Sequence, residues 1–222
     1  MPTMNASEGG HRIYKCAFVT VGASASFKPL IEEVLSDAFI AKLKSLGFTH
    51  LIVQCGPDYD YFESAKPRRD SNDSNGLNIT GFPFKKDLQP WFALAAASTL
   101  RETKERAKGL IITHAGSGSI LDALDFDTNI IAVPNPALMG NHQSEIADEM
   151  EKQGFLTQAK VGSLADLLSE DALAATKKQW PPEPDPDSVW PGGLWDVVNY
   201  LMPRRTLGGG PADDENLKVP AK

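Results

Sequence analysis

The residues best suited to chemistry form a short glycine- and serine-rich segment, His114-Ala-Gly-Ser-Gly-Ser119. The segment follows an apolar run typical of a strand and precedes a run typical of a helix. Its two glycines let a ligand approach the backbone closely, and its two serines add hydroxyl donors to the free N–H groups of a first helical turn. Such a turn suits a phosphate or diphosphate. A plain strand-to-helix turn capped by a serine fits the pattern equally well.

Asp122 lies one turn into the helix predicted after this segment. That position is too far along the helix for contact with a phosphate, but its carboxylate is well placed to accept hydrogen bonds from a ribose diol. The simpler interpretation is a favourable charge near a helix N-terminus, which contributes about 0.3–1 kcal/mol.

A second polar group opens the next predicted helix and consists of Asn141, His142, Gln143 and Glu145. Sugar hydroxyls need this mixture of amide and carboxylate groups. The alternative is a helix N-cap at Asn141, two surface side chains and a first-turn acid. His142 and Glu145 have the spacing of two metal ligands, but with no third ligand in view we predict no metal site.

Two further loops follow predicted strands. Val21–Ser26 contains Gly22 and Ser24 and is flexible and rich in hydroxyl groups. In Thr80–Phe84 the backbone could pair with the edge of a nucleobase while an aromatic ring packs on it. Each loop alone reads as an ordinary turn. Their common position at one edge of a sheet is what favours a binding site.

The elements that must position these residues alternate between strand and helix along the chain. The expected strands are Lys15–Gly22, His50–Gly56, Leu77–Thr80, Gly109–His114, Asn129–Pro134 and Phe155–Ala159. The expected helices are Pro29–Leu46 with a break near Ser36, Asp87–Lys108, Ser117–Leu124, Gln143–Gln153 and Leu164–Lys178. This alternation predicts an α/β fold, a Rossmann-like parallel sheet with helices on both faces. Such sheets bind ligands outside the carboxyl ends of their strands.

One domain, residues 15–180, accounts for all of these elements. The other predicted segments are a flexible N-terminus (1–14), a polar excursion within the domain (58–76), a proline-rich linker (181–193), an apolar-faced helix for docking (194–203) and a disordered tail (204–222). Packing of that last helix onto its own sheet is an equally good interpretation.

Composition narrows the function classes. The 222 residues carry a net charge of −7, which argues against a nucleic-acid partner. The polar N-terminus, Met1–Arg12, lacks the apolar core of a secretory signal, so we expect a cytosolic protein. Cys16 and Cys55 fall in apolar runs and are expected to be buried free thiols.

Several segments resemble, in order, the motifs of glycosyltransferase family 28, in its C-terminal, donor-binding half. They are Val21–Phe27, Leu51–Gly56, His114–Ser119, and Val133–Asn135 together with Asn141–Glu145. The likeness extends from about residue 15 to about residue 205. It implies the C-terminal half of a GT-B glycosyltransferase, which uses a UDP-sugar.

The resemblance also implies roles for individual residues. Gly116, Ser117, Gly118 and Ser119 would bind the donor diphosphate, and Asp122 would hold the ribose, although the family commonly has the longer Glu there. Asn141, His142 and Gln143 would face N-acetylglucosamine, and the backbone near Phe84 would face the uracil. The loop with Gly22 and Ser24 would lie near the diphosphate and the acceptor.

The implied reaction is an inverting transfer of N-acetylglucosamine from UDP-N-acetylglucosamine to dolichol-diphosphate-linked N-acetylglucosamine, giving a β1,4 linkage in N-glycan precursor synthesis. We expect no cofactor. A base must deprotonate the acceptor hydroxyl, and His114 and Glu145 are the candidates in this chain.

Enzymes of this architecture place their site between two such domains, and this chain has the length for one. We therefore expect a heterodimer in which a membrane-anchored, acceptor-binding subunit holds the lipid-linked acceptor at the cytosolic face of the endoplasmic reticulum. A non-catalytic UDP-sugar-binding or regulatory subunit is the alternative. A dinucleotide-dependent oxidoreductase fits poorly, because the first predicted strand is not followed by Gly-x-Gly-x-x-Gly.

Overall fold

A computed structural model describes residues 13–67, 76–98, 105–138, 142–175, 178 and 180–181. The chain divides into two compact units, Met1–Trp180 and Pro181–Lys222, and every helix and strand described here belongs to the first. The predicted linker, docking helix and tail lie outside the described residues, apart from the first residue of the linker. None of the helices in the described ranges is both long and apolar enough to cross a membrane.

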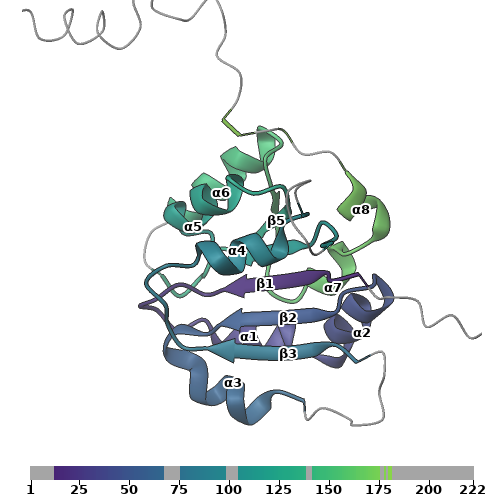
Figure 1. Ribbon diagram of the computed structural model, residues 1–222. Helices are drawn as coiled ribbons and strands as arrows, with labels where there is room; N and C mark the ends of the chain where they lie inside the picture. The colour runs from purple at the N-terminus through teal and green to yellow at the C-terminus, as the bar shows by residue number, and fades with distance from the viewer. Residues whose placement is uncertain are drawn as a thin grey trace, which may run out of the picture. The chain divides into compact units, whose positions relative to one another are not determined.

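The described elements alternate as the sequence predicts (Figure 1). The strands are β1 (Cys16–Thr20), β2 (His50–Gln54), β3 (Asn78–Phe82), β4 (Leu110–Thr113), β5 (Asn129–Ala132) and β6 (Thr157–Gln158). The α-helices are α1 (Lys28–Val34), α2 (Asp37–Ser45), α3 (Tyr59–Ala65), α4 (Gln89–Ala95), α5 (Ser117–Leu124), α6 (His142–Lys152), α7 (Leu164–Leu167) and α8 (Glu170–Ala174). A short 3-10 helix, η1 (Gly56–Asp58), precedes α3.

The six strands form one parallel sheet in the order β3-β2-β1-β4-β5-β6. Its centre is β1, where Phe18 pairs in register with Ile52 of β2 and Ile111 of β4. This strand order is that of Rossmann-type domains. The predicted fold class is confirmed.

Helices cover both faces of the sheet because the central strands are apolar on both sides. On one face, Ala17 and Val19 belong to a buried cluster that includes side chains of α1, α2, α3 and α7. On the other face, Cys16 and Phe18 belong to a buried cluster that includes side chains of α4, α5 and α6. Figure 1 shows α4, α5 and α6 above β1, and β2 and β3 below it. Because helices pack on both faces, the ends of the central strands are held in place, and the predicted site residues follow directly after these ends.

Two predicted helices are shorter than expected. The helix predicted over Asp87–Lys108 ends at Ala95, because Ala96 is extended and the backbone beyond it bonds to neighbouring segments. Among these bonds, Ala107 N donates to the carbonyl oxygen of Tyr14. The helix predicted over Leu164–Lys178 is divided between α7 and α8, because the Ser169 hydroxyl caps a new helix by accepting from Ala172 N at 3.0 Å.

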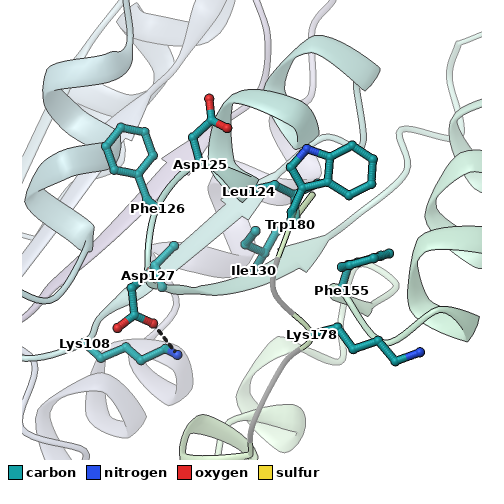
Figure 2. A pocket seen from close by; sticks show the side chains of 10 residues that line it. Lys108, Leu124, Asp125, Phe126, Asp127, Ile130, Phe155, Lys178 and Trp180 are labelled. Atoms are coloured by element: carbon teal, nitrogen blue, oxygen red, sulfur yellow. Dashed lines mark ion pairs between the residues drawn. The ribbon is translucent and has the colours of Figure 1, made fainter. Parts of the chain in front are cut away.

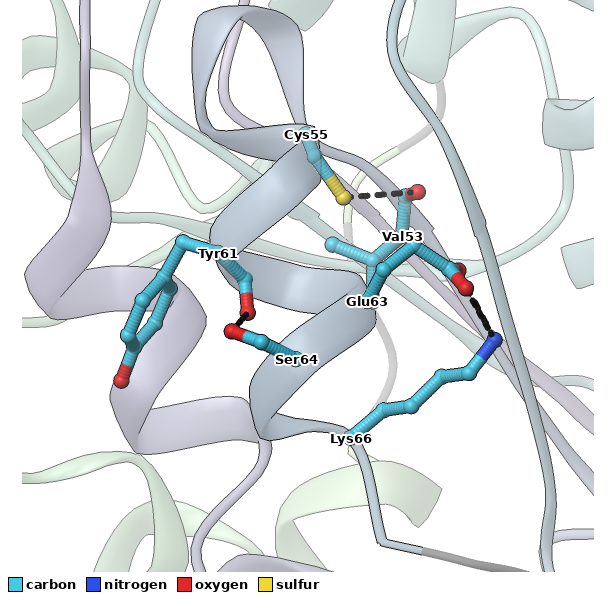
Figure 3. A network of polar contacts seen from close by, with 6 residues as sticks. All are labelled: Val53, Cys55, Tyr61, Glu63, Ser64 and Lys66. Atoms are coloured by element: carbon cyan, nitrogen blue, oxygen red, sulfur yellow. Dashed lines mark hydrogen bonds and ion pairs between the residues drawn. The ribbon is translucent and has the colours of Figure 1, made fainter.

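The prediction of a polar excursion from residue 58 onward was wrong for its first part, which forms α3. Phe62 is fully buried, and its ring lies so close to Gly81 of β3 that an added methyl group there would overlap it. The exposed side of α3 carries an ion pair of 2.8 Å between Lys66 and Glu63 (Figure 3). The buried Phe62, with the partly buried Tyr59 and Tyr61 packed against the same core, therefore attaches this otherwise polar segment to the sheet.

Candidate functional site

A cavity of about 380 Å³ lies at the carboxyl ends of β1 and β4, within the range of small-molecule sites. From β1 the chain adds β2 and β3 on one side, and it then crosses over to add β4, β5 and β6 on the other side. In sheets of this kind the point between β1 and β4 leaves a crevice for a ligand. The lining residues come from the loops after β1, β3 and β4, from β1 and β2, and from α5. They are Thr20, Gly22, Ala23, Gln54, Phe84, Lys85, Lys86, Leu88, His114, Gly116, Ser117, Gly118, Ser119 and Asp122.

His114 lies between two glycines of the cavity wall. A methyl group added at Gly22 would stand 2.8 Å from His114 Nε2, and one added at Gly116 would stand 2.5 Å from the same atom. Gly22 also has a φ of +85°, a conformation that favours glycine. Only glycine at these two positions lets the imidazole ring fill the space between the β1 and β4 loops.

Partial burial favours the neutral imidazole of His114 at pH 7. Desolvation lowers its pKa below the ordinary value, and an interaction with the Thr20 backbone opposes this shift in part. Its Nδ1 atom is buried without a hydrogen-bond partner. The next residue, Ala115, is fully buried with a φ of +63°, a strained conformation for a residue with a side chain. The turn after β4 therefore has the strain and the unsatisfied polar atom that are common at functional sites.

The N-terminus of α5 faces this cavity. Gly116 is its N-cap residue and provides no side-chain cap, so the first-turn N–H groups remain available to a ligand. Ser117 and Gly118 are exposed, and a methyl group added at Gly118 would meet open space. Asp122, one turn further along, is also exposed and lines the cavity. The arrangement can accept an anion at the helix end and a hydroxyl donor at Asp122.

Gln54 joins two walls of the cavity, a role that we did not predict for it. Its side chain is almost fully buried and accepts a hydrogen bond of 2.6 Å from the Thr20 hydroxyl. Its amide nitrogen donates to the carbonyl oxygens of Gly22 and Pro83, at 2.8 Å and 2.9 Å. A polar residue at the end of an apolar strand was the available signal.

A second set of hydrogen bonds fastens the loop after β1 to its surroundings. Asp58 accepts from the Ser26 hydroxyl at 2.8 Å and from Phe27 N at 2.7 Å. Asn135, in the loop after β5, donates from its side chain to the Ser26 carbonyl oxygen at 2.9 Å. The Gln143 side-chain oxygen in turn accepts from Asn135 N at 3.2 Å. The start of α6 is thus connected to the loop after β1 through Asn135.

Three of the remaining predicted site residues, Ser24, Gln143 and Glu145, do not line the cavity. Ser24 and Glu145 are exposed and do not line it, and Gln143 makes the contact to Asn135 instead. Asn141 lies outside the described residues, and His142 is described only as the first residue of α6. Within the described ranges, no group of three or more His, Cys, Asp or Glu side chains could hold a metal ion.

Lys85 and Lys86 line the cavity and were also missed. They directly follow Phe84, in a segment that the sequence marks for its backbone and aromatic ring. Both side chains are exposed, and they bring positive charge to the mouth of the cavity. The signal was present as two adjacent cationic residues after a strand.

A second cavity, of about 330 Å³, lies at the other end of the strands (Figure 2). Its lining residues include Lys108, just before β4, and Asp127, just before β5, which form an ion pair of 2.7 Å. Trp180 and Phe155 pack there edge to face, with ring centroids 5.3 Å apart. None of the predicted site residues that the structure describes lines it, so the cavity at the carboxyl ends is the candidate site.

The strand order and the cavity at its reversal point define a Rossmann-like α/β domain of the ligand-binding type. The chain belongs to the glycosyltransferase family 28 C-terminal domain family, whose model matches residues 16–181. The family predicted from the motifs is therefore confirmed.

Proteins of known name that are similar to this chain are consistent with its membership of this family. The UDP-N-acetylglucosamine transferase subunit ALG13 of Saccharomyces cerevisiae is 33% identical over 165 residues, which cover 64% of this chain and 76% of that protein. The human protein of the same name is 35% identical over 142 residues, which cover 64% of this chain and 11% of that protein. An NMR solution structure of ALG13 is similar with a TM-score of 0.53 and 28% identity, covering 79% of this chain and 93% of that chain.

Proposed function

We propose that this chain binds UDP-N-acetylglucosamine in the cavity between β1 and β4 and transfers its sugar as the donor-binding subunit of a two-subunit enzyme. The observation that carries the proposal is the meeting of the α5 N-terminus, Asp122 and the Phe84 loop in one cavity. The name of the relatives, a UDP-N-acetylglucosamine transferase subunit, supports both the donor and the need for a partner.

The chemistry of the lining residues suits the parts of this donor. The diphosphate would accept hydrogen bonds from the first-turn N–H groups of α5, and the ribose diol would donate to Asp122. The uracil would pair with the backbone near Phe84. To reach Gln143, which does not line the cavity, the sugar would extend toward the start of α6, where the amide nitrogen of Gln143 would donate to it while the side-chain oxygen accepts from Asn135 N.

The transfer is a single displacement with inversion. The acceptor hydroxyl oxygen attacks the anomeric carbon, and the bond from that carbon to the β-phosphate oxygen breaks. The electron pair of that bond leaves with UDP, and the hydroxyl proton passes to a base. His114 is neutral and therefore able to accept a proton, but its partly buried ring is packed between Gly22 and Gly116. We assign it to holding the two loops, and the base to the partner subunit.

The proposed acceptor is dolichol-diphosphate-linked N-acetylglucosamine, and the proposed partner is a membrane-anchored subunit that binds it. The reaction would take place at the cytosolic face of the endoplasmic reticulum and give a β1,4 linkage. The cavity is formed by one Rossmann-like domain, whereas a glycosyl transfer needs a surface for the acceptor as well. A second domain from another chain would supply that surface.

A transfer assay tests the proposal directly. The purified chain, membranes that contain the partner, and the two together are each given UDP-N-acetylglucosamine and the lipid-linked acceptor. We expect turnover only from the combination, and binding of UDP by the purified chain alone. Turnover by the chain without membranes would contradict the divided site, and absence of UDP binding would contradict the donor assignment.

A further inference from the structure

We infer that Lys85 and Lys86 supply the positive charge that neutralises the donor diphosphate and stabilises UDP as it leaves. The inference rests on the proposed function and assigns a role in it to two side chains that the motifs do not mark. Both residues line the cavity together with the N-terminus of α5.

The charge of the cavity differs in sign from that of the chain. The chain as a whole has a net charge of −7, whereas the charged residues that line the cavity in the described part of the chain are Lys85, Lys86 and Asp122, which sum to one positive charge. Burial leaves His114 neutral. The lysines therefore provide the full positive charges at the site, beside the partial charge of about +0.5 at a helix N-terminus. A diphosphate with two negative charges needs more than the helix end alone provides.

Neither lysine is occupied by a carboxylate of the described chain. Other lysines form ion pairs, as Lys66 does with Glu63 and Lys108 with Asp127, but no ion pair within the described ranges involves Lys85 or Lys86. The neighbouring Asp87 directs its carboxylate to the start of α4, accepting from Gln89 N at 2.9 Å. The two ammonium groups are thus available to an anionic ligand.

Hydrogen bonds from the end of β2 hold the backbone that precedes the two lysines. The Pro83 carbonyl oxygen accepts from the Gln54 side chain at 2.9 Å and from Gly56 N at 2.8 Å. Phe82, one residue earlier, accepts from Cys55 N at 2.9 Å. These bonds fix the start of the loop relative to β1 and β2. Long lysine side chains on a fixed backbone can then follow the diphosphate without a rearrangement of the loop.

The reaction gives this charge a catalytic value. When the bond between the anomeric carbon and the β-phosphate oxygen breaks, UDP retains the electron pair and its diphosphate gains one negative charge. A cation beside the diphosphate interacts more strongly with this product-like charge than with the intact donor, so it lowers the barrier as well as the dissociation constant. The lysines act on the leaving group and not on the acceptor.

Binding of UDP and of uridine to the purified chain tests the inference, because only UDP carries the diphosphate. Calorimetry compares the wild type with the Lys85→Ala/Lys86→Ala double variant. We expect the affinity for UDP to fall by about tenfold or more, while the affinity for uridine stays within about twofold. The UDP affinity of the wild type should also fall more steeply with added salt than that of the double variant.

Two further variants serve as controls. Lys85→Arg/Lys86→Arg keeps the charge and should keep UDP affinity within about threefold. Lys108→Ala removes a lysine at the opposite end of the strands and should change neither affinity. An equal loss for uridine and UDP would overturn the inference, since it would indicate damage to the loop, and so would unchanged UDP affinity in the double variant. Failure of the proposed function would be distinct, because the wild type itself would then bind no UDP.

Discussion

The side-chain amide of the buried Gln54 donates a hydrogen bond of 2.8 Å to the carbonyl oxygen of Gly22. The same nitrogen donates to the carbonyl oxygen of Pro83, so a single NH₂ group joins the loop after β1 to the loop after β3. These loops carry two walls of the candidate donor cavity. The distance between the walls therefore depends on one side chain at the end of β2.

Replacing Gln54 with Glu should loosen the cavity. The carboxylate has the same size but cannot donate to the two carbonyl oxygens, which then lose a buried donor at a cost of about 1–3 kcal/mol. We expect a lower free energy of unfolding in urea and weaker binding of UDP. Gln89→Glu makes the same change at an exposed position and should alter stability by no more than about 0.5 kcal/mol. Equal stability of the two variants would contradict the role of Gln54.

Alanine at Gly116 and at Gly118 should have opposite effects on folding. At Gly116 the new methyl group meets His114 Nε2 at 2.5 Å, and the ring cannot retreat because Gly22 closes its other side. We expect a loss of about 1–3 kcal/mol in the free energy of unfolding. At Gly118 the methyl group meets open space within α5, and alanine should stabilise the helix by up to about 1 kcal/mol.

Gly118→Ala should nevertheless weaken UDP binding by about tenfold, which corresponds to about 1.4 kcal/mol. The reason is that the space left open at Gly118 is where we place the diphosphate. Urea unfolding and calorimetry on the same protein sample separate the two effects. Full UDP affinity in a stable Gly118→Ala variant would place the diphosphate elsewhere.

Much of the fold could be predicted from the sequence because the apolar strands leave few alternatives. The break near Ser36 was visible since serine is a preferred helix cap, and the structure has its hydroxyl accepting from Phe39 N. Helix α3 was missed because its attachment depends on Phe62 meeting Gly81, two residues brought together only by the sheet. The early end of α4 likewise depends on backbone bonds to distant segments.

The site could be predicted only where a motif marks it. The turn from His114 to Ser119 has a local signature, and the cavity lies there. Lys85 and Lys86 have no such signature, and Gln54 lies in the Leu51–Gly56 motif without a predicted role, because the roles of all three depend on which loops the strand order brings together. Glu145 was expected at the site from its position in a motif, yet it is exposed outside the cavity. Proximity in sequence does not determine which side of a helix faces a ligand.

Asp122 provides a test of nucleotide orientation. If its carboxylate accepts from the ribose diol, Asp122→Ala should weaken UDP binding by about tenfold and 2′-deoxy-UDP binding by less, since the deoxy ligand lacks one donor. Asp125→Ala, at the C-cap of the same helix and lining the cavity at the other end of the strands, should change neither affinity. Equal losses for the two nucleotides would show that Asp122 does not contact the 2′-hydroxyl group.

His114 should make the stability of the domain depend on pH below neutrality. Above about pH 6.5 the imidazole is neutral in both the folded and the unfolded chain, so it adds no pH dependence. Below that value the unfolded chain binds a proton more readily than the partly buried folded ring does, because desolvation lowers the folded pKa. The free energy of unfolding contributed by this site therefore decreases as pH falls from about 6.5 to the folded pKa.

Urea unfolding at pH 7.5 and pH 5.5 measures this effect. The wild type should lose stability between the two values, and His114→Asn, which cannot bind the proton, should lose less. Other groups titrate in the same range, so the difference between wild type and variant is the informative quantity. An identical pH dependence in the two proteins would mean that the folded His114 takes up the proton as readily as the unfolded chain does, contrary to its burial between Gly22 and Gly116.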